Sequence, residues 1–377
     1  MSTADPLYTN TEDVVLYASE DPLVFTRGGS VSPISVRYET YGQLNRAKSN
    51  AVFVCHALTG DAHAAGFKVG ASKPGWWDTM IGPGKPVDTE RYFVICPNLL
   101  GGCQGSTGPS SINPATGQSY GLDFPILDMQ DFVNVHRRLI NHLEISQLLA
   151  VIGGSLGGMQ VLQWALSAPA DMAAAVIIAA SSRLSTQNIA FSAVAREAIM
   201  RDSGFEAGHY LEKGTSPDTG LSIARMMAHI TYMSESALRQ RFGREPQYGD
   251  LTPGFGIDFA IESYLNHQAE VFLDRFDALS YLYLSRVMDY FDPFGDAQSC
   301  SQIAAHPVPC LVCSFASDWR FSPAQSRRIV TRLEASGVPV TYREIDGGVG
   351  HDSFLLPVGD YHELVRVYLA RTFQEVC

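Results

Sequence analysis

Six short runs of apolar, largely β-branched residues constrain the fold of this chain more than any other feature. They are Ala51–Cys55, Tyr92–Cys96, Leu148–Ile152, Ala174–Ala180, Pro309–Phe315 and Val338–Ile345. Because these runs are apolar almost throughout, they predict strands that are buried on both faces, as in a parallel sheet. Helical patterns lie between several of them, and in residues 128–143 Asp128 is placed to cap such a helix. This alternation predicts a doubly wound α/β sheet with right-handed crossovers.

Two segments depart from the strand–helix alternation. Val14–Gly42 has the pattern of leading antiparallel strands. The stretch from Thr186 to Cys300 has no convincing buried strand and predicts a helical insertion; its helical periods are Ile189–Met200, Gly220–Tyr232, Ser234–Phe242 and Phe259–Phe272. We therefore expect a core formed by residues 1–185 and 301–377, with a helical insertion at 186–300.

Composition excludes several classes of protein. Of the 377 residues 46% are hydrophobic, which is enough for a large core. Lys and Arg number 27 against 39 Asp and Glu, a net charge of −12, so a nucleic-acid or anionic-membrane binder is not expected. The sequence has no long apolar run typical of a membrane span, and its first residues do not resemble a signal peptide. Seven scattered cysteines predict reduced thiols and a cytoplasmic protein.

The sharpest local signal is the sequence VIGGSLGGMQ at residues 151–160. It contains the G-x-S-x-G pattern around Ser155, directly after an apolar run and before a helix-compatible segment. This is the context of a nucleophile elbow, in which a serine sits on a tight turn between a strand and a helix. The alternative is a glycine-rich turn with a serine at its tip. The strand–turn–helix context favours Ser155 as a nucleophile.

A nucleophilic serine needs a base and an acid that orients the base. In α/β-hydrolases these follow the serine in the order Asp or Glu, then His. Asp318 follows the predicted strand that ends at Phe315, and His351 lies in the loop after Val338–Ile345. Both are therefore expected at the carboxyl ends of core strands, where ligands bind in open α/β sheets. Asp346 and Asp352 flank His351 and remain alternatives to Asp318.

An oxyanion hole requires two backbone N–H groups. One is expected from Leu156, which follows the nucleophile, and the other from the turn after the first core strand. In that turn Leu58 is the first choice and Ala57 the second.

The His and Cys residues of the sequence do not have the spacing of a metal site. His56 and His63 have no further ligands at a suitable spacing, and His56 is expected to be a packed turn residue. Cys310 and Cys313 lie three positions apart in one predicted strand, so their side chains should point to opposite faces. We expect no metal and no cofactor.

Several longer stretches resemble one family throughout most of the chain. They are CHALTGDAHAAG from Cys55, KPGWWD from Lys73, IGPGKPVDT from Ile81, NLLGGCQGSTGPSSINPATG from Asn98, GGSLGGMQ from Gly153, ARMMAHITYMS from Ala224, RFDALSYLYL from Arg275, SDWRFSP from Ser317 and GHDSFLLP from Gly350. These stretches resemble the homoserine O-acyltransferases of the α/β-hydrolase superfamily, which act early in methionine synthesis.

The resemblance implies an α/β-hydrolase fold with a helical lid that contributes to a homodimer. It also implies a triad of Ser155, Asp318 and His351, with Arg225 and Asp352 as substrate contacts. A guanidinium can pair with the carboxylate of homoserine and a carboxylate with its ammonium. The implied reaction has two steps: acyl transfer from an acyl-CoA to Ser155, then from Ser155 to the homoserine hydroxyl.

Arg320 bears on the choice of acyl donor. A succinyl group ends in a carboxylate, so a cation near the acyl pocket favours succinyl-CoA, whereas an unpaired buried Arg beside an acetyl methyl group would be costly. Members that resemble succinyltransferases carry this DWRFSP form. We therefore expect homoserine O-succinyltransferase activity. The alternatives are an acetyltransferase using acetyl-CoA, a serine hydrolase or thioesterase, and a non-catalytic binding protein on the same scaffold.

Overall fold

The computed structural model describes residues 9, 11–251, 254–295 and 297–376. An eight-stranded sheet forms its centre, in the order β1-β4-β8-β5-β9-β10-β11-β12. The strands from β8 to β12 run parallel, and β4 and β1 add an antiparallel edge. Their bounds are β1 Thr11–Tyr17, β4 Ile34–Tyr41, β5 Ala51–Cys55, β8 Phe93–Pro97, β9 Ala150–Gly154, β10 Ala175–Ile178, β11 Cys310–Phe315 and β12 Val340–Ile345. The predicted mostly parallel, doubly wound sheet is confirmed.

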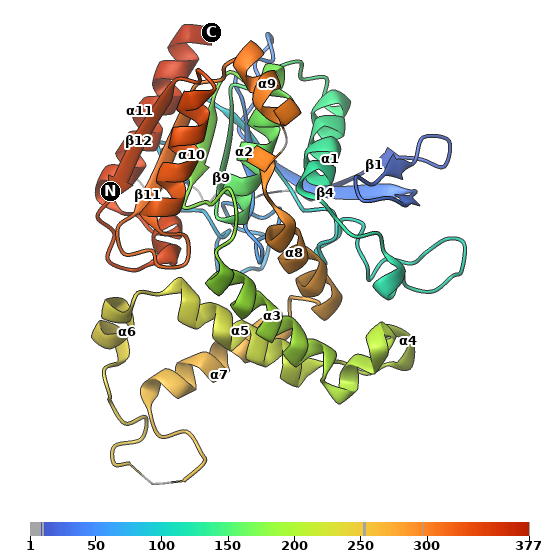
Figure 1. Cartoon of the computed structure of the whole chain (residues 1–377), viewed down its shortest axis with the longest axis vertical. Coiled ribbons are helices and arrows are strands. Elements are labelled where there is room, and N and C mark those ends of the chain that lie inside the picture. The colour runs from blue at the N-terminus through green and yellow to red at the C-terminus, as the bar shows by residue number, and fades with distance from the viewer. Residues whose placement is uncertain (1–8, 10, 252–253, 296, 377) are drawn as a thin grey trace.

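Helices cover both faces of this sheet (Figure 1). One apolar cluster includes side chains of α1 (Met129–His142), α2 (Leu156–Ser167) and α10 (Pro323–Ala335), and the other includes side chains of α11 (Gly359–Val376). In β5, Phe53 packs in the first cluster and Val54 in the second, which explains why the strand sequence is apolar without alternation. Cys310 and Cys313 of β11 likewise lie in different clusters.

The predicted cap of α1 is confirmed in detail. Asp128 accepts a hydrogen bond from the N–H of Gln130, and Asp131 accepts one from the N–H of Asp128. The structure adds two small two-stranded sheets, β2 (Leu23–Val24) with β3 (Ser30–Val31), and β6 (Ile81–Gly82) with β7 (Val87–Asp88).

The helical insertion follows β10, and its helices α3 to α7 lie beyond the carboxyl ends of the parallel strands (Figure 1). Its helices are α3 Thr186–Met200, α4 Tyr210–Lys213, α5 Asp218–Tyr232, α6 Glu235–Phe242, α7 Ala260–Leu273, α8 Ala278–Tyr290 and α9 Ala297–Ala305. Helix α5 packs against both α3 and α7, whereas α9 packs against α2 and spans the predicted boundary at residue 300. The group α3–α7 is called the lid below.

Within the described residues, none of the helices combines the length and apolarity needed to cross a bilayer. The described cysteines Cys55, Cys96, Cys103, Cys310 and Cys313 are free thiols. The side chains of Cys300 and Cys377 lie outside the described part of the chain.

Candidate active site

Ser155 occupies the turn between β9 and α2. Its backbone has φ 60° and ψ −124°, a conformation that L-residues rarely adopt and that is typical of strained functional turns. The turn closes tightly because its flanking residues are glycines. A Cβ atom on Gly157 would lie 2.0 Å from the carbonyl oxygen of Cys55, and one on Gly153 would lie 2.5 Å from the backbone of Gly157. The sequence therefore folds here into the elbow that its pattern predicted.

Ser155, His351 and Asp318 form one chain of hydrogen bonds. The oxygen Oγ of Ser155 lies 2.8 Å from His351 Nε2, and His351 Nδ1 lies 2.7 Å from Asp318 Oδ2. All three side chains are buried. The other carboxylate oxygen, Asp318 Oδ1, accepts bonds of 2.9 Å from two backbone N–H groups, those of Arg320 and Phe321. These donors fix the carboxylate in the plane needed to hold the imidazole.

Of the three candidate acids, all of them described residues, only Asp318 is hydrogen-bonded to His351. Within the described part of the chain, neither Asp346 nor Asp352 makes a hydrogen bond to His351, whereas Asp318 does. His351 begins the 3₁₀ turn His351–Leu355 after β12, and Asp318 lies in the loop after β11.

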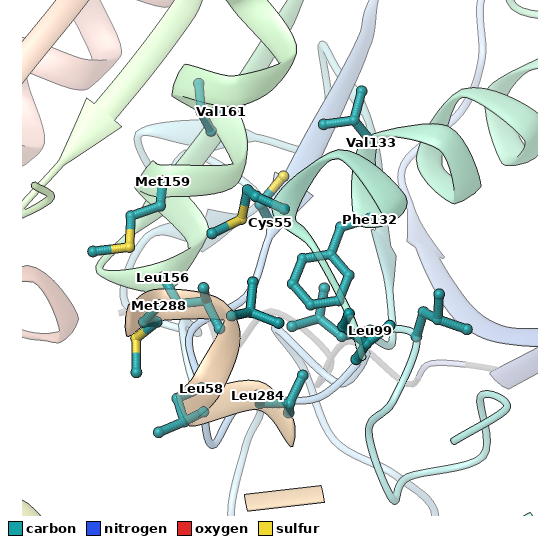
Figure 2. Packing of buried hydrophobic residues seen from close by; sticks show 14 of the residues in the cluster. Cys55, Leu58, Leu99, Phe132, Val133, Leu156, Met159, Val161, Leu284 and Met288 are labelled. Carbon is teal, nitrogen blue, oxygen red and sulfur yellow. The ribbon is translucent and has the colours of Figure 1, made fainter. Parts of the chain in front are cut away.

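Of the predicted oxyanion-hole residues, Leu58 borders the same cavity as Ser155 and Leu156 follows Ser155 in the sequence. Leu58 and Leu156 pack with Met288 of α8 in one apolar cluster (Figure 2). The backbone N–H groups of Leu58 and Leu156 donate to no acceptor in the described part of the chain. Ala57, the second choice, borders the cavity as well, and the free N–H groups of Leu58 and Leu156 lie near Ser155.

The cavity above Ser155 is small, about 50 Å³. Its walls include Leu58, Tyr232, Met288, Arg320, His351 and Asp352. Both the core and the lid therefore contribute to it.

Asp352 borders this cavity, and its carboxyl group is largely shielded from water. Burial raises its pKa from 3.8 to about 6, and the nearby His351 and Arg225 partly oppose that rise. A carboxyl group with this pKa is still mainly ionised at pH 7 and able to pair with a cation.

Arg225, the other predicted substrate contact, lies on α5 but does not border the cavity. Its guanidinium lies 4.5 Å from the centre of the Phe272 ring. Burial lowers its pKa, and its Nε and Nη1 atoms are buried without a hydrogen-bond partner among the described residues. One turn further along α5, His229 Nε2 is also buried without a hydrogen-bond partner among the described residues. Burial lowers the pKa of this imidazole to about 3. An unpaired buried guanidinium is costly unless an anion joins it.

Arg320 is buried beside the triad and borders the cavity. Its Nη1 donates to Thr231 Oγ1 at 2.5 Å, and its guanidinium lies 5.3 Å from the centre of the Tyr232 ring. It forms no ion pair with any carboxylate in the described part of the chain. The sequence did not single out Thr231 or Tyr232, and only their place in the stretch ARMMAHITYMS next to Arg225 could have drawn attention to them.

Metal chemistry finds no support in the described side chains, which contain no cluster of three His, Cys, Asp or Glu residues. His56 is instead fully occupied by backbone contacts. The N–H of Leu99 donates to its Nε2 at 3.0 Å, and its Nδ1 lies 2.7 Å from the carbonyl oxygen of Ala57.

Known proteins share both the fold and much of the sequence of this chain. A family model described as the alpha/beta hydrolase fold matches residues 50–357. The chain is 55% identical over 363 residues to a homoserine O-succinyltransferase of Nocardioides sp., covering 96% of this chain and 98% of that protein. It is 49% identical over 365 residues to a homoserine O-acetyltransferase of Caulobacter vibrioides, covering 96% of each.

Solved structures give the same picture of the fold. A homoserine O-acetyltransferase from Bacillus anthracis superposes with a TM-score of 0.87 at 27% identity, covering 96% of this chain and 98% of that one. An esterase superposes equally well, with a TM-score of 0.87 at 28% identity, covering 96% of this chain and 100% of that one.

Proposed function

Since this chain belongs to the homoserine O-acyltransferases of the α/β-hydrolase fold, we propose that it transfers a succinyl group from succinyl-CoA to the hydroxyl of L-homoserine. The products are O-succinyl-L-homoserine, for methionine synthesis, and CoA. The observation that carries the proposal is the hydrogen-bonded chain Ser155–His351–Asp318 beside an Arg320 that has no carboxylate partner among the described residues.

In the first step, Ser155 Oγ attacks the thioester carbonyl while His351 Nε2 takes its proton. The N–H groups of Leu58 and Leu156 stabilise the oxyanion, and the CoA thiol leaves with the proton from His351. In the second step, His351 removes the proton of the homoserine hydroxyl, which attacks the succinyl-serine ester. Collapse of the second tetrahedral intermediate returns the proton to Ser155. The chemistry requires no cofactor beyond succinyl-CoA as co-substrate, and it predicts ping-pong kinetics.

Two charged side chains suit a zwitterionic acceptor. Asp352 in the cavity would pair with the ammonium of homoserine. Arg225, whose Nε and Nη1 are unsatisfied in this structure, would pair with its carboxylate after a small movement toward the cavity. We expect Asp352→Asn and Arg225→Leu to raise the KM for homoserine at least tenfold, with a smaller effect on the KM for succinyl-CoA.

Arg320 supports succinyl-CoA over acetyl-CoA as the donor. The relatives are divided between the two names at similar identity, so overall similarity does not choose between them. A buried guanidinium without an anionic partner is better satisfied by the terminal carboxylate of a succinyl group than by a methyl group.

The donor prediction is tested with Arg320→Leu. A charged hydrogen bond contributes roughly 1.5–3 kcal/mol, so kcat/KM for succinyl-CoA should fall by about 10- to 150-fold. The value for acetyl-CoA should change only a few-fold. Equal losses with both donors would contradict the role of Arg320, and faster turnover of acetyl-CoA by the wild type would favour an acetyltransferase.

The nucleophile is tested by mass spectrometry after mixing the protein with succinyl-CoA in the absence of homoserine. We expect one succinyl group on the peptide that holds Ser155, and none in Ser155→Ala, whose turnover should fall by at least about 10³-fold. A wild type that gains no acyl group under these conditions would contradict the two-step mechanism.

A hydrolase is the second candidate, because an esterase shares the fold over 96% of this chain. The two functions differ in the role of water. If CoA is released equally fast with and without homoserine, the protein is a thioesterase. A transferase should release CoA much faster when homoserine is present.

We also propose that the protein forms a homodimer through the lid. The apolar side chains of Ile223 and Ile230 on α5 and Val271 on α7 are each more than 40% exposed, and the two isoleucines lie seven residues apart on one side of the helix. Sedimentation velocity should give a dimer for the wild type and a monomer for Ile223→Glu/Ile230→Glu. The control Val367→Glu, exposed on α11 of the core, should remain dimeric. We place the enzyme in the cytoplasm, in keeping with its free described thiols.

A further inference from the structure

Three buried polar residues, His136, Gln160 and His56, are joined by hydrogen bonds next to the turn that holds Ser155. Their exposed fractions are 2%, 0% and 2%. They come from three separate elements: His136 from α1, Gln160 from α2, and His56 from the turn after β5. The acyl-transfer steps described above do not use any of them. Polar side chains buried in an apolar layer need hydrogen-bond partners, and the partners of these three show what they hold in place.

Gln160 connects the two segments that carry the oxyanion-hole donors. Its Nε2 donates to the carbonyl oxygen of His56 at 3.0 Å and to that of Leu156 at 3.2 Å. The first carbonyl precedes the turn that contains Leu58, and the second belongs to the residue whose own N–H is the other donor. One side-chain amide thus links both segments.

The orientation of the Gln160 amide is fixed from its far side. Its Oε1 lies 3.0 Å from His136 Nε2, and because an amide oxygen only accepts, His136 must carry its proton on Nε2. Burial lowers the pKa of His136 to about 4, so the imidazole is neutral at pH 7. A flipped Gln160 amide would place its NH₂ group against the His136 N–H and its oxygen against two carbonyls.

His56 fixes the turn itself. The N–H of Leu99 donates to its Nε2, so the proton lies on Nδ1 and is donated to the carbonyl oxygen of Ala57 at 2.7 Å. The same oxygen accepts from the N–H of Gly60 at 3.0 Å, which closes the turn. With this carbonyl held, the peptide plane between Ala57 and Leu58 cannot rotate, and the direction of the Leu58 N–H is set.

We propose that Gln160 and His56 are positioning residues that hold the two oxyanion-hole donors at a fixed separation before substrate binds. Donors that are already aimed at the developing charge need no reorganisation during the reaction, which is the main source of electrostatic catalysis. The inference rests on the proposed function, because it assigns a role only if Ser155 forms tetrahedral intermediates.

The test compares Gln160→Met with Gln163→Met. Methionine nearly matches glutamine in length but bonds to neither carbonyl. Gln163 lies on the same helix, and its Nε2 donates to Gln130 at 2.8 Å, away from both donors. We expect Gln160→Met to lower kcat by about 10- to 100-fold, somewhat less than the removal of a donor, with KM values little changed. The control should keep kcat within about threefold.

A second readout separates positioning from a general loss of structure. A boronic acid that forms a tetrahedral adduct on Ser155 should bind Gln160→Met more weakly by the same factor as kcat/KM falls. Thermal unfolding of both variants is followed in parallel. If Gln160→Met does not fold, His136→Phe replaces it, because a phenyl ring can pack between Phe53 and Trp164 as His136 does, with ring centroids 4.9 and 5.7 Å away.

Each outcome bears on the proposal. A folded Gln160→Met with unchanged kcat, an equal loss in the Gln163→Met control, or a raised KM with normal kcat would overturn it. A wild type that hydrolyses p-nitrophenyl esters but does not transfer succinyl groups would contradict the proposed function alone. In that case the same kcat comparison is made on the ester.

Discussion

Asp352 illustrates how one buried carboxyl group affects the stability of the folded protein. Its pKa of about 6 means that the folded protein keeps this proton at pH values where the unfolded chain has lost it. Between about pH 4 and 6 the folded state therefore binds more protons than the unfolded state, and the stability contributed by Asp352 falls as the pH rises. The energetic cost is consistent with a carboxylate kept for its interaction with a cationic substrate.

The variant Asp352→Asn removes this cost. Its free energy of unfolding relative to the wild type should increase as the pH rises from about 4 to 7, by up to about 3 kcal/mol for a shift of this size. Urea unfolding of both proteins at several pH values measures the difference. A difference that does not change with pH would contradict the prediction, and Asp360→Asn, on the exposed surface of α11, serves as the control.

At the scale of elements, the elbow depends on the close approach of α2 to the end of β5. The Cβ of an alanine at position 157 would lie 2.0 Å from the carbonyl oxygen of Cys55, and neither backbone can move without disturbing the sheet. Overpacking a rigid site of this kind commonly destabilises a protein by about 1–3 kcal/mol or more.

We expect Gly157→Ala to lose at least about 3 kcal/mol of stability, together with activity, because the contact is between backbone atoms. Gly359 begins α11, and a Cβ there would meet nothing within 4 Å. The control Gly359→Ala should leave stability unchanged or raise it slightly. Chemical unfolding of the two variants measures both effects, and a Gly157→Ala protein as stable as the wild type would show that the elbow can relax.

Which elements could be predicted depended on how local their signal is. The strand Ala51–Cys55 and the cap at Asp128 follow from neighbouring residues and were confirmed. Helix α8, with ten buried residues in thirteen, offers few polar positions that would mark a solvent-facing side, and it was not predicted as a helix. The contact between Arg320 and Thr231 joins residues 89 positions apart and has no counterpart in the local sequence.

At the scale of the molecule, the lid and the core meet over the nucleophile. Trp319 of the core donates from Nε1 to the carbonyl oxygen of Met233 at 2.9 Å, and the N–H of Ser234 donates to that of Val349 at 2.9 Å. A cavity of about 50 Å³ has room for a few water molecules but not for an acyl-CoA and an amino acid. Under the proposed function, we therefore expect the lid to separate from the core to admit substrates and to return over the acyl-serine, where it would exclude water.

Trp319 should report this movement. It is 36% exposed and contacts the lid, whereas Trp77 and Trp164 are fully buried in the core. Stopped-flow fluorescence on mixing with succinyl-CoA should show a change in the wild type and lose most of it in Trp319→Phe. A signal of the same size in Trp319→Phe would mean that the lid stays in place around Trp319.

The position of Arg320 between core and lid bears on how the proposed enzyme would select its acyl donor. Thr231 and Tyr232, which hold the guanidinium, belong to α5, whereas Arg320 itself follows β11. If the lid separates from the core as we expect, Arg320 loses its contacts with Thr231 and Tyr232. Under the proposed function, we therefore expect the choice between an acetyl and a succinyl donor to depend on closure of the lid. A mutation that weakens the contact between lid and core should then reduce donor selectivity without changing any residue that contacts the donor.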